Sequence, residues 1–404
     1  VDSAYGFDYF DDYLDHLVAK GLTISEWDVL STVRPAPIHF WYRQSPKYLV
    51  ASEFFLSYER HFVSPSDPPW TVEGMTGVWL DPDGRLLRLK VVPPPFAASE
   101  SGEGSVDWSP LFEAAGFKMA QFSPVAPQRN PLVTCDERLA WEGDDPEAGQ
   151  IRIEACANVG RPAHFEVVPE WRWKSVGSSQ PSSSLADAIF FSTLLFGVVV
   201  GGAMLARRNL KIGRGDRRGA LRVASFVFLL YALAWVLQAH HVTTFSEIGL
   251  FFDFLAFGLL VAALVWMVYV ALEPYARRLW PEGLISWSRL LAGRLRDPLV
   301  GRDILIGAAT GVFTHCWWGV YRVLLDHLDR PVEKLSSADL ISLSGTVEMI
   351  GSLCDLFANA LFMPVAWLFV LLLLRILLRR QWLAVIVVLL FASGSAVPGM
   401  PNPM

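Results

Sequence analysis

Residues 285–303 of this 404-residue chain read ISWSRLLAGRLRDPLVGRD, and they lie between two strongly apolar stretches. The segment carries Arg289, Arg294, Arg296 and Arg302, whereas its apolar neighbours carry almost no basic residues. Arginine-rich segments between long apolar runs are typical of loops at a membrane surface. The side of the membrane on which this loop lies therefore decides how the whole chain is arranged.

Composition and charge divide the chain near residue 184. Hydrophobic residues make up 52% of the chain, and the mean hydropathy of +0.34 is high for a soluble protein. Residues 1–183 hold 26 acidic and 15 basic residues, whereas the remainder holds 14 acidic and 19 basic ones. The acidic first part argues against a nucleic-acid partner, because phosphate binding needs a basic surface. We expect one aqueous part and one part within the lipid bilayer.

Residues 1–175 are predicted to form an α+β domain, followed by a Ser/Gly/Pro-rich tether at 176–184. Helical spacing indicates helices in DYFDDYLDHLVAKG, ISEWDVLSTV and WSPLFEAAGF. Strands are expected in IHFWYRQ and YLVASEFFL, on either side of a Ser45-Pro46 turn. Two β-hairpins are expected, the first in MTGVWLDPDGRLLRLKVV, where Asp81-Pro82-Asp83-Gly84 forms the turn. The second joins IRIEACANV to AHFEVVPEW.

The second part is predicted to be an all-α polytopic membrane domain over residues 185–397, followed by a tail at 398–404. Apolar runs of about 20 residues are long enough to cross a bilayer. The six expected spans are 185–206, 220–239, 248–272, 304–325, 346–374 and 382–397.

Basic residues alternate between the loops of this part. Loops 207–219, 273–303 and 375–381 are rich in Lys and Arg, whereas the loops between them are poor in both. Short basic loops remain in the cytoplasm, so residues 1–183 are expected outside it. The residues expected at the cytoplasmic interface are Arg207, Arg208, Arg277, Arg278, Arg289, Arg294, Arg296 and Arg302.

The arginine-rich segment itself has a helical pattern. Leu284, Trp287, Leu291 and Leu295 recur at helical spacing, and the arginines fall on another face. This pattern predicts an interfacial amphipathic helix whose arginines meet anionic lipid headgroups. A solvated basic loop is the alternative.

Four cysteines are present, two in each part. Cys316 and Cys354 fall in apolar runs and are expected to be packing residues. Cys135 and Cys156 lie in the aqueous part, where they form either a disulfide or two free thiols.

Ionisable residues inside expected spans are costly to bury and are often functional. The candidates for an intramembrane polar cluster are Asp253, His315, Glu348 and Asp355. They could form an ion path, or a metal site together with His240, His241 and His327. The alternative is an interfacial or structural role. An intramembrane protease is not supported, because the chain lacks an H-E-x-x-H motif.

Tryptophan and tyrosine are abundant in the aqueous part, where they could line a ligand groove or form a core. The residues concerned are Trp41, Tyr42, Trp70, Trp79, Trp108, Trp141, Trp171 and Trp173. The last two are expected near the lipid headgroups.

Several segments carry a resemblance to a known family, in consistent order along nearly the whole chain. These segments are VDSAYGFDY, IHFWYRQSPKYL, SPSDPPWTVEGMTGVWLDPDGRLLRLKVVPPP, FSPVAPQ, LAWEG and LEPYARRLWPEGLISWSRLLAGRLRDPLVGRD. Together they resemble the region after the catalytic domain in bacterial membrane-bound serine/threonine protein kinases. That resemblance implies a cytoplasmic kinase domain first, then one span, an extracytoplasmic domain and a multi-span region in the inner membrane. Residues 1–183 are expected outside the cytoplasm, yet the chain starts without a basic and apolar export signal, so we expect either a removed signal peptide or an earlier membrane segment upstream of Val1.

Kinase catalytic motifs are absent from this sequence. GRGDRRG at 213–219 does not have the spacing of the Gly-rich loop, Gly301-Arg302-Asp303 lacks the preceding His, and Asp253-Phe254 is followed by Leu255. The chain is thus not expected to phosphorylate a substrate by itself, whether it has another enzymatic activity stays open, and no cofactor is expected for it. ATP and Mg²⁺ are implied only for the missing kinase domain.

These observations predict the sensor or anchor region of a bacterial serine/threonine kinase, with an unidentified extracytoplasmic ligand and the kinase domain as partner. The alternative is a free-standing transporter or channel with an extracytoplasmic binding domain.

Overall fold

The computed structural model describes residues 1–10, 13–14, 16, 36–51, 62–94, 106–145, 149–170, 172, 185–279, 283–294, 296–327, 340–378, 382–383 and 386. The chain divides into two compact units. Unit 1 comprises residues 1–178, 237–250 and 321–352, and unit 2 comprises residues 179–236, 251–320 and 353–404.

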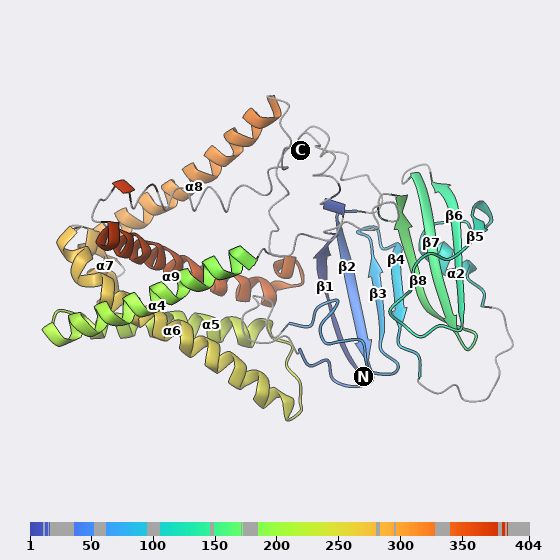
Figure 1. The fold of residues 1–404 in the computed structure, drawn as a ribbon, viewed down its shortest axis with the longest axis horizontal. Helices are drawn as coiled ribbons and strands as arrows, with labels where there is room; N and C mark the ends of the chain where they lie inside the picture. Colours follow the sequence, from blue (N-terminus) through green and yellow to red (C-terminus); the bar gives the residue numbers. More distant parts are fainter. Residues whose placement is uncertain are drawn as a thin grey trace. The chain divides into compact units, whose positions relative to one another are not determined.

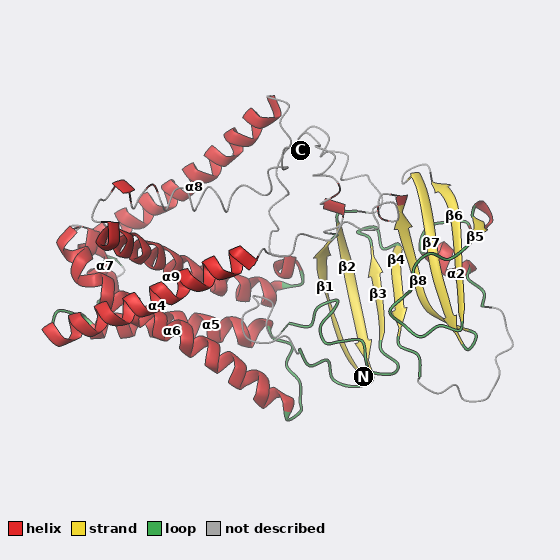
Figure 2. Ribbon diagram, viewed as in Figure 1, coloured by secondary structure: helices red, strands yellow, loops and turns green. Residues whose placement is uncertain are grey.

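Unit 1 is built on one antiparallel sheet of eight strands, in the order β1-β2-β3-β4-β8-β7-β6-β5 (Figures 1 and 2). The strands are β1 (Asp2–Tyr9), β2 (Ile38–Ser45), β3 (Thr76–Leu80), β4 (Leu86–Val91), β5 (Ser123–Val125), β6 (Glu137–Asp145), β7 (Gly149–Asn158) and β8 (Arg161–Pro169). Because β4 pairs with β8, strands from two separate stretches of the chain meet at the middle of the sheet.

Both predicted hairpins are present, as β3–β4 and β7–β8. In the first turn Gly84 has a φ of +81°, a conformation that glycine adopts without steric cost. The carboxylate of Asp81 closes this turn by accepting the amide hydrogens of Asp83 and Arg85, at 3.0 and 2.8 Å. Local turn chemistry thus fixes the register of β3 against β4.

Of the helices expected in the aqueous part, the one in WSPLFEAAGF is confirmed as α2 (Ser109–Ala114), and Tyr13, Leu14 and His16 of DYFDDYLDHLVAKG are also helical. The prediction of a helical conformation is wrong for Tyr9, which is the last residue of β1 and pairs with Ile38. Strand YLVASEFFL is not formed at residues 48–51, and the remainder of it lies outside the described residues, as do ISEWDVLSTV and the tether. Unit 1 is therefore richer in strand than the α+β prediction.

The two faces of the sheet differ in chemistry. One face carries Phe165, Ile153 and Trp141, which pack with Phe112 of α2 in an apolar core. The opposite face carries a smaller apolar cluster at β2 and β3. Alongside that cluster, on β4, β7 and β8, it carries charged side chains in place of an apolar core.

Unit 2 is helical. The helices of the second part of the chain are α4 (Leu185–Ile212), α5 (Arg217–Gln238), α6 (Ser246–Leu279), α7 (Gly283–Leu291), α8 (Pro298–His327) and α9 (Thr346–Leu378). Residues of α4, α5, α6 and α9 share one hydrophobic core, and these helices lie together in Figure 1. The 3₁₀ helix η3 (Leu340–Leu343) belongs to unit 1, where it lies against β1.

Three helices of the described residues, α5, α6 and α9, are long and apolar enough to cross a membrane. The chain is therefore membrane-associated, but the prediction of six spans is supported for only three of them. The expected spans at 185–206 and 304–325 coincide with α4 and α8, which are long helices. The expected span 382–397 lies almost entirely outside the described residues.

Candidate functional site

The charged face of the sheet in unit 1 is the candidate functional site. Strand register places Arg88 of β4 between Trp79 of β3 and Glu166 of β8. Lys90 and His164 form the next pair on the same face, because side chains alternate along a strand. Basic, acidic and aromatic groups are thus gathered from three strands.

Glu166 lies at the centre of this face, and its side chain is 10% exposed. It forms ion pairs with Arg88, with Arg172 at 2.7 Å and with Arg129 at 3.5 Å. Burial would raise the pKa of Glu166, but Arg88 and the other basic neighbours hold that pKa well below its usual value. The carboxylate is ionised, and three guanidinium groups surround its single negative charge.

A second ionic group fixes the loop that carries Arg129. Arg152 of β7 pairs with Glu154 at 2.6 Å and with Glu142 of β6. Arg152 also donates a hydrogen bond to the carbonyl of Ala126, and Glu154 accepts one from the amide of Gln128 at 3.2 Å. These bonds hold residues 126–128 against the sheet.

Trp70 forms a platform for two further cations. The guanidinium carbon of Arg43 lies 4.2 Å, and the ammonium nitrogen of Lys90 4.6 Å, from the ring centroid of Trp70. Such cation–π contacts are attractive because the ring face is electron-rich. The indole fits there because Gly77 has no side chain; a Cβ at Gly77 would lie 2.4 Å from the Trp70 ring.

Lys90 has no carboxylate partner among the residues that the structure describes. Burial, together with the charges of Arg88 and Arg43, lowers the pKa of Lys90 to about 8. Arg43, in contrast, donates to the carbonyls of Ser64 and Pro68, at 2.6 and 2.7 Å. The face therefore holds a surplus of positive charge that a bound anion would neutralise.

A small cavity of about 50 Å³ opens on this face, lined by Arg88, Glu166 and Arg172 together with Trp79 and Phe10. It has room for one small polar group, and its walls combine guanidinium donors with aromatic rings. We name the set Arg43, Trp70, Trp79, Arg88, Lys90 and Glu166 the cationic face.

Of the cationic face, the sequence alone indicates only the two aromatic members, Trp70 and Trp79. Trp41 and Trp79 lie in the apolar cluster beside the cationic face, whereas Trp108 and Trp141 belong to the apolar core on the opposite face of the sheet. Trp171 and Trp173 lie outside the described residues. The alternation in RLLRLKV and HFEVV places the charged residues on one face, but the pairing of β4 with β8 cannot be obtained from local sequence.

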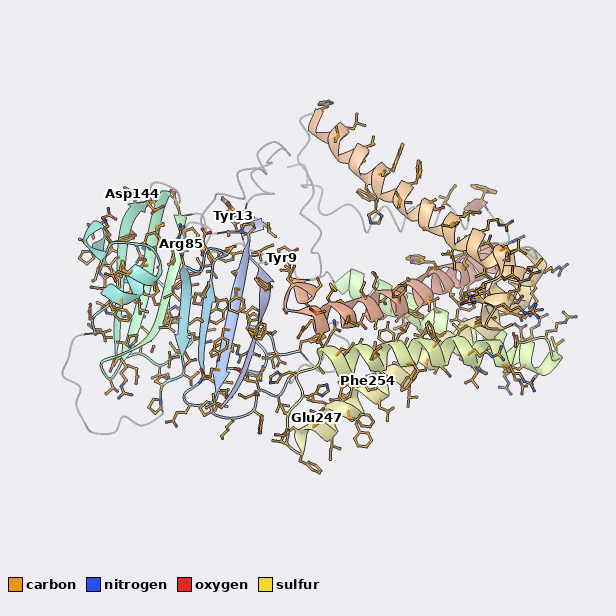
Figure 3. The ribbon with its side chains drawn as sticks, turned by 180° about the vertical axis from the view of Figure 1, so that it is seen from behind. Tyr9, Tyr13, Arg85, Asp144, Glu247 and Phe254 are labelled. Carbon is orange, nitrogen blue, oxygen red and sulfur yellow. A yellow bond between two sulfur atoms is a disulfide. The ribbon has the colours of Figure 1, made fainter. Side chains whose placement is uncertain are left out.

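The expected cytoplasmic arginines fall into two groups. Arg207, Arg208, Arg278, Arg294 and Arg296 are exposed. The other three pair with acidic residues, Arg277 with Glu273, Arg289 with Asp297 at 2.8 Å, and Arg302 with Asp303 at 2.9 Å. Nitrogen-tipped side chains gather at the end of α6 far from Glu247 in Figure 3.

The predicted amphipathic helix is present as α7 but is shorter than its pattern. It ends at Leu291, and Gly293 follows with a φ of +81°. The amide of Arg294 donates to the carbonyl of Arg289, which closes the helix end. Leu295 lies outside the described residues.

The four candidates for an intramembrane polar cluster lie on three helices. Asp253 is exposed on α6, next in sequence to the buried Phe254, and His315 is exposed on α8, where Nδ1 lies 3.0 Å from the Gly311 carbonyl oxygen. Glu348 and Asp355 are half-buried on α9. Within the described ranges no three His, Cys, Asp or Glu residues are grouped as metal ligands, and this search included His240, His241 and His327.

Cys135 and Cys156 are joined by a disulfide, which is one of the two alternatives that the sequence left open. It ties the segment just before β6 to the buried Cys156 near the end of β7. Of the other two cysteines, Cys354 is buried as expected, and Cys316 is exposed.

Comparison with known proteins gave no match to a family model, to a curated protein sequence or to a solved structure. The resemblance to kinase membrane regions therefore stays a prediction.

Proposed function

We propose that this chain is the sensor and anchor region of a bacterial serine/threonine protein kinase, and that its sheet domain binds an anionic ligand outside the cytoplasm. The observation that carries the ligand class is the surplus of positive charge on the cationic face, where Lys90 has no carboxylate partner in the described part of the chain. The kinase assignment depends on the resemblance of the quoted segments.

The distribution of basic residues supports an orientation in which the sheet domain lies outside the cytoplasm. Loop 239–245 lacks Lys and Arg, and it belongs to the same compact unit as the sheet. The arginine-rich loops at 207–219 and 277–302 belong to the other unit. Loops rich in Lys and Arg remain in the cytoplasm, so the sheet and loop 239–245 would lie outside it.

Contacts within unit 1 offer a route by which ligand binding could reach the helices. Asp2 of β1 accepts a hydrogen bond from the amide of Leu49 at 2.7 Å and lies 2.9 Å from His240. The hydroxyls of Tyr48 and Thr243 lie 2.6 Å apart. Loop 239–245 connects α5 to α6, so a displacement of β1 would act directly on two candidate spans. The ligand must favour one of two arrangements of this contact to transmit a signal.

The gene sequence upstream of the codon for Val1 gives the first test. A kinase catalytic domain there supports the proposal, whereas a signal peptide directly upstream favours the transporter or channel.

Autophosphorylation of the full-length protein in vesicles gives the functional test. We expect Lys90→Gln to abolish any change in phosphorylation rate caused by an external anion, with sulfate as the probe. We expect the rate without sulfate to stay unchanged, because Lys90 belongs to the ligand face and not to the kinase. A sulfate response that is the same in Lys90→Gln and in the wild type would contradict the proposed ligand face.

A further inference from the structure

A buried carboxylate in unit 2 lacks a hydrogen-bond partner. Glu273 of α6 is 5% exposed; its Oε1 accepts a hydrogen bond from Arg277, whereas its Oε2 is buried and has no partner among the described residues. An unsatisfied buried charge is costly, and native proteins rarely keep one without a function. This oxygen requires a donor from outside the chain.

Glu273 lines a cavity of about 140 Å³. Tyr269 and Trp287 also line this cavity, and Trp287 Nε1 donates to the Tyr269 hydroxyl at 3.3 Å. Arg218 and Arg222 of α5 and Arg277 of α6 also line it, together with Asp216, whose carboxylate accepts the amide hydrogen of Gly219 at 2.9 Å. The structure thus combines an acceptor that lacks a donor with basic groups in one small space.

The two arginines of α5 differ in their surroundings. Arg222 donates to the carbonyl of Leu291 at 2.9 Å and so connects α5 to the end of α7. Arg218 is exposed and has no ion-pair partner within the part of the chain that the structure describes. Arg218 is therefore available to an external anion.

The cavity lies where the candidate spans end. Helix α5 begins at Arg217, α6 ends at Leu279, and both are among the helices apolar enough to cross a membrane. Helix α7 places Trp287 beside them, and tryptophan is enriched at the level of lipid headgroups. The molecule most abundant at this depth is a phospholipid.

We propose that this cavity binds the headgroup of phosphatidylethanolamine. The ammonium group donates to Glu273 Oε2, and the phosphate pairs with Arg218 and Arg222. Phosphatidylglycerol carries the phosphate but no cation for Glu273. Phosphatidylcholine carries a cation without N–H donors, and its three methyl groups enlarge the headgroup. The lipid would bind here whether or not the sheet domain senses a ligand.

Lipid retention by the purified chain tests this assignment. The protein is exchanged into detergent with equal amounts of phosphatidylethanolamine, phosphatidylglycerol and phosphatidylcholine, and bound lipids are counted by native mass spectrometry. We expect retention of phosphatidylethanolamine to exceed that of each other lipid about tenfold, the value of one hydrogen bond to a buried charge. Equal retention of the three lipids, or a preference for phosphatidylglycerol, would overturn the proposal.

Two variants separate the two ends of the headgroup. Glu273→Gln should remove the preference for phosphatidylethanolamine, whereas Arg218→Gln should lower retention of all three lipids alike, because all carry the phosphate. The matched control is Arg278→Gln, since Arg278 is exposed and does not line the cavity. This variant should change neither the preference for phosphatidylethanolamine nor the retention of the three lipids. A Glu273→Gln protein that keeps the preference would contradict the role of the carboxylate.

The wild-type protein provides a test that does not depend on the folding of variants. Retention should fall stepwise when the ammonium of phosphatidylethanolamine is methylated once, twice and three times, because each methyl removes a donor. Retention that is independent of methylation overturns the proposal. Soluble O-phosphoethanolamine distinguishes the two sources of this chemistry, since an excess of it should leave the lipid bound. Displacement of the lipid at equal concentration would assign the site to the soluble compound.

Discussion

The carboxylate of Asp2 and the imidazole of His240 lie 2.9 Å apart, although 238 residues separate them in the sequence. Both side chains are mostly buried. The contact joins the first strand of the sheet to the loop between two candidate spans, and both partners belong to unit 1. It is the contact on which transmission from the sheet to the helices would depend.

A double-mutant cycle measures this coupling. Asp2→Asn and His240→Gln should each destabilise unit 1, and the double variant should recover about 1 kcal/mol relative to the sum of the single effects. Urea unfolding of the wild type, the two single variants and the double variant, followed by tryptophan fluorescence, gives the four free energies of unfolding. The control is Asp2→Asn combined with His241→Gln. His241 pairs with Glu247 at 2.6 Å, so the changes in unfolding free energy from these two substitutions should be additive. Additive effects of Asp2→Asn and His240→Gln would show that the contact contributes nothing.

The same contact predicts a dependence of stability on pH. Burial would raise the pKa of Asp2, but the hydrogen bonds from His240 and from the Leu49 amide hold it below 3.8. A carboxyl whose pKa is lowered by folding stabilises the folded state above its unfolded value. That contribution is therefore present above about pH 3.8 and is lost as the pH falls further. The Asp2→Asn variant should show a shallower loss of stability between pH 4 and the acid transition, and identical acid profiles would contradict the prediction.

Removal of Arg152 tests the buried ionic group beneath loop 126–128. Arg152 and Glu154 are 1% and 4% exposed, so Arg152→Ala leaves a buried carboxylate without its partner. We expect unit 1 to lose about 3 kcal/mol of unfolding free energy. Arg161→Ala removes an exposed arginine from β8 and should change stability by less than about 0.5 kcal/mol. Equal losses in the two variants would mean that the buried Arg152 contributes no more to stability than an exposed arginine.

The disulfide gives an independent prediction of stability. It closes a loop with a sequence separation of 21 residues, and such a loop contributes on the order of 3 kcal/mol by restricting the unfolded chain. The Cys135→Ala/Cys156→Ala double variant should lose about that amount. Reducing agent should destabilise the wild type and leave the variant unchanged. A wild type that is insensitive to reduction under unfolding conditions would contradict this contribution.

Lys90 predicts how anion binding depends on pH. Because the pKa of Lys90 is lowered to about 8, binding of an anion should raise this pKa, and Lys90 should take up a proton when the anion binds near that pH. Sulfate keeps its charge in this range, so its affinity should fall as the pH rises above 8. Lys90→Gln should weaken sulfate binding about tenfold and remove the pH dependence, whereas Lys90→Arg should keep binding without the pH dependence. Titration calorimetry at several pH values between 6.5 and 9.5 measures both.

The parts of unit 1 that sequence predicts are those set by local chemistry. Asp81 and Gly84 form their turn from nearby residues, and Gly160 supplies positive φ in the turn between β7 and β8, whereas the positive φ of the β-branched Val159 is not predicted by local sequence. In contrast, β6 carries the acidic Glu137, Glu142, Asp144 and Asp145, which interrupt its apolar pattern. Glu142 and Asp144 are tolerated because they lie on the ionic face of the sheet, and Glu137 and Asp145 because they are the end residues of the strand.

The cationic face could not be predicted from spacing alone. Arg88 and Glu166 are 78 residues apart, and only the pairing of β4 with β8 brings them together. The sequence indicates Trp70 as one of the aromatic residues of a ligand groove or a core, but its contact with Lys90 depends on the absence of a side chain at Gly77. The cavity at Glu273 depends likewise on the packing of α5, α6 and α7, which the apolar pattern of each helix does not specify.

The proposed function requires the sheet to lie outside the cytoplasm, and cysteine labelling in intact spheroplasts measures which side of the membrane each unit faces. Native thiols are removed by Cys316→Ser and Cys354→Ala, and one exposed residue is changed in each unit, Thr71→Cys in unit 1 or Arg214→Cys in unit 2. A membrane-impermeant maleimide should label Thr71→Cys in intact spheroplasts and should label Arg214→Cys only after lysis. Labelling of Arg214→Cys in intact spheroplasts, with Thr71→Cys protected, would contradict the account.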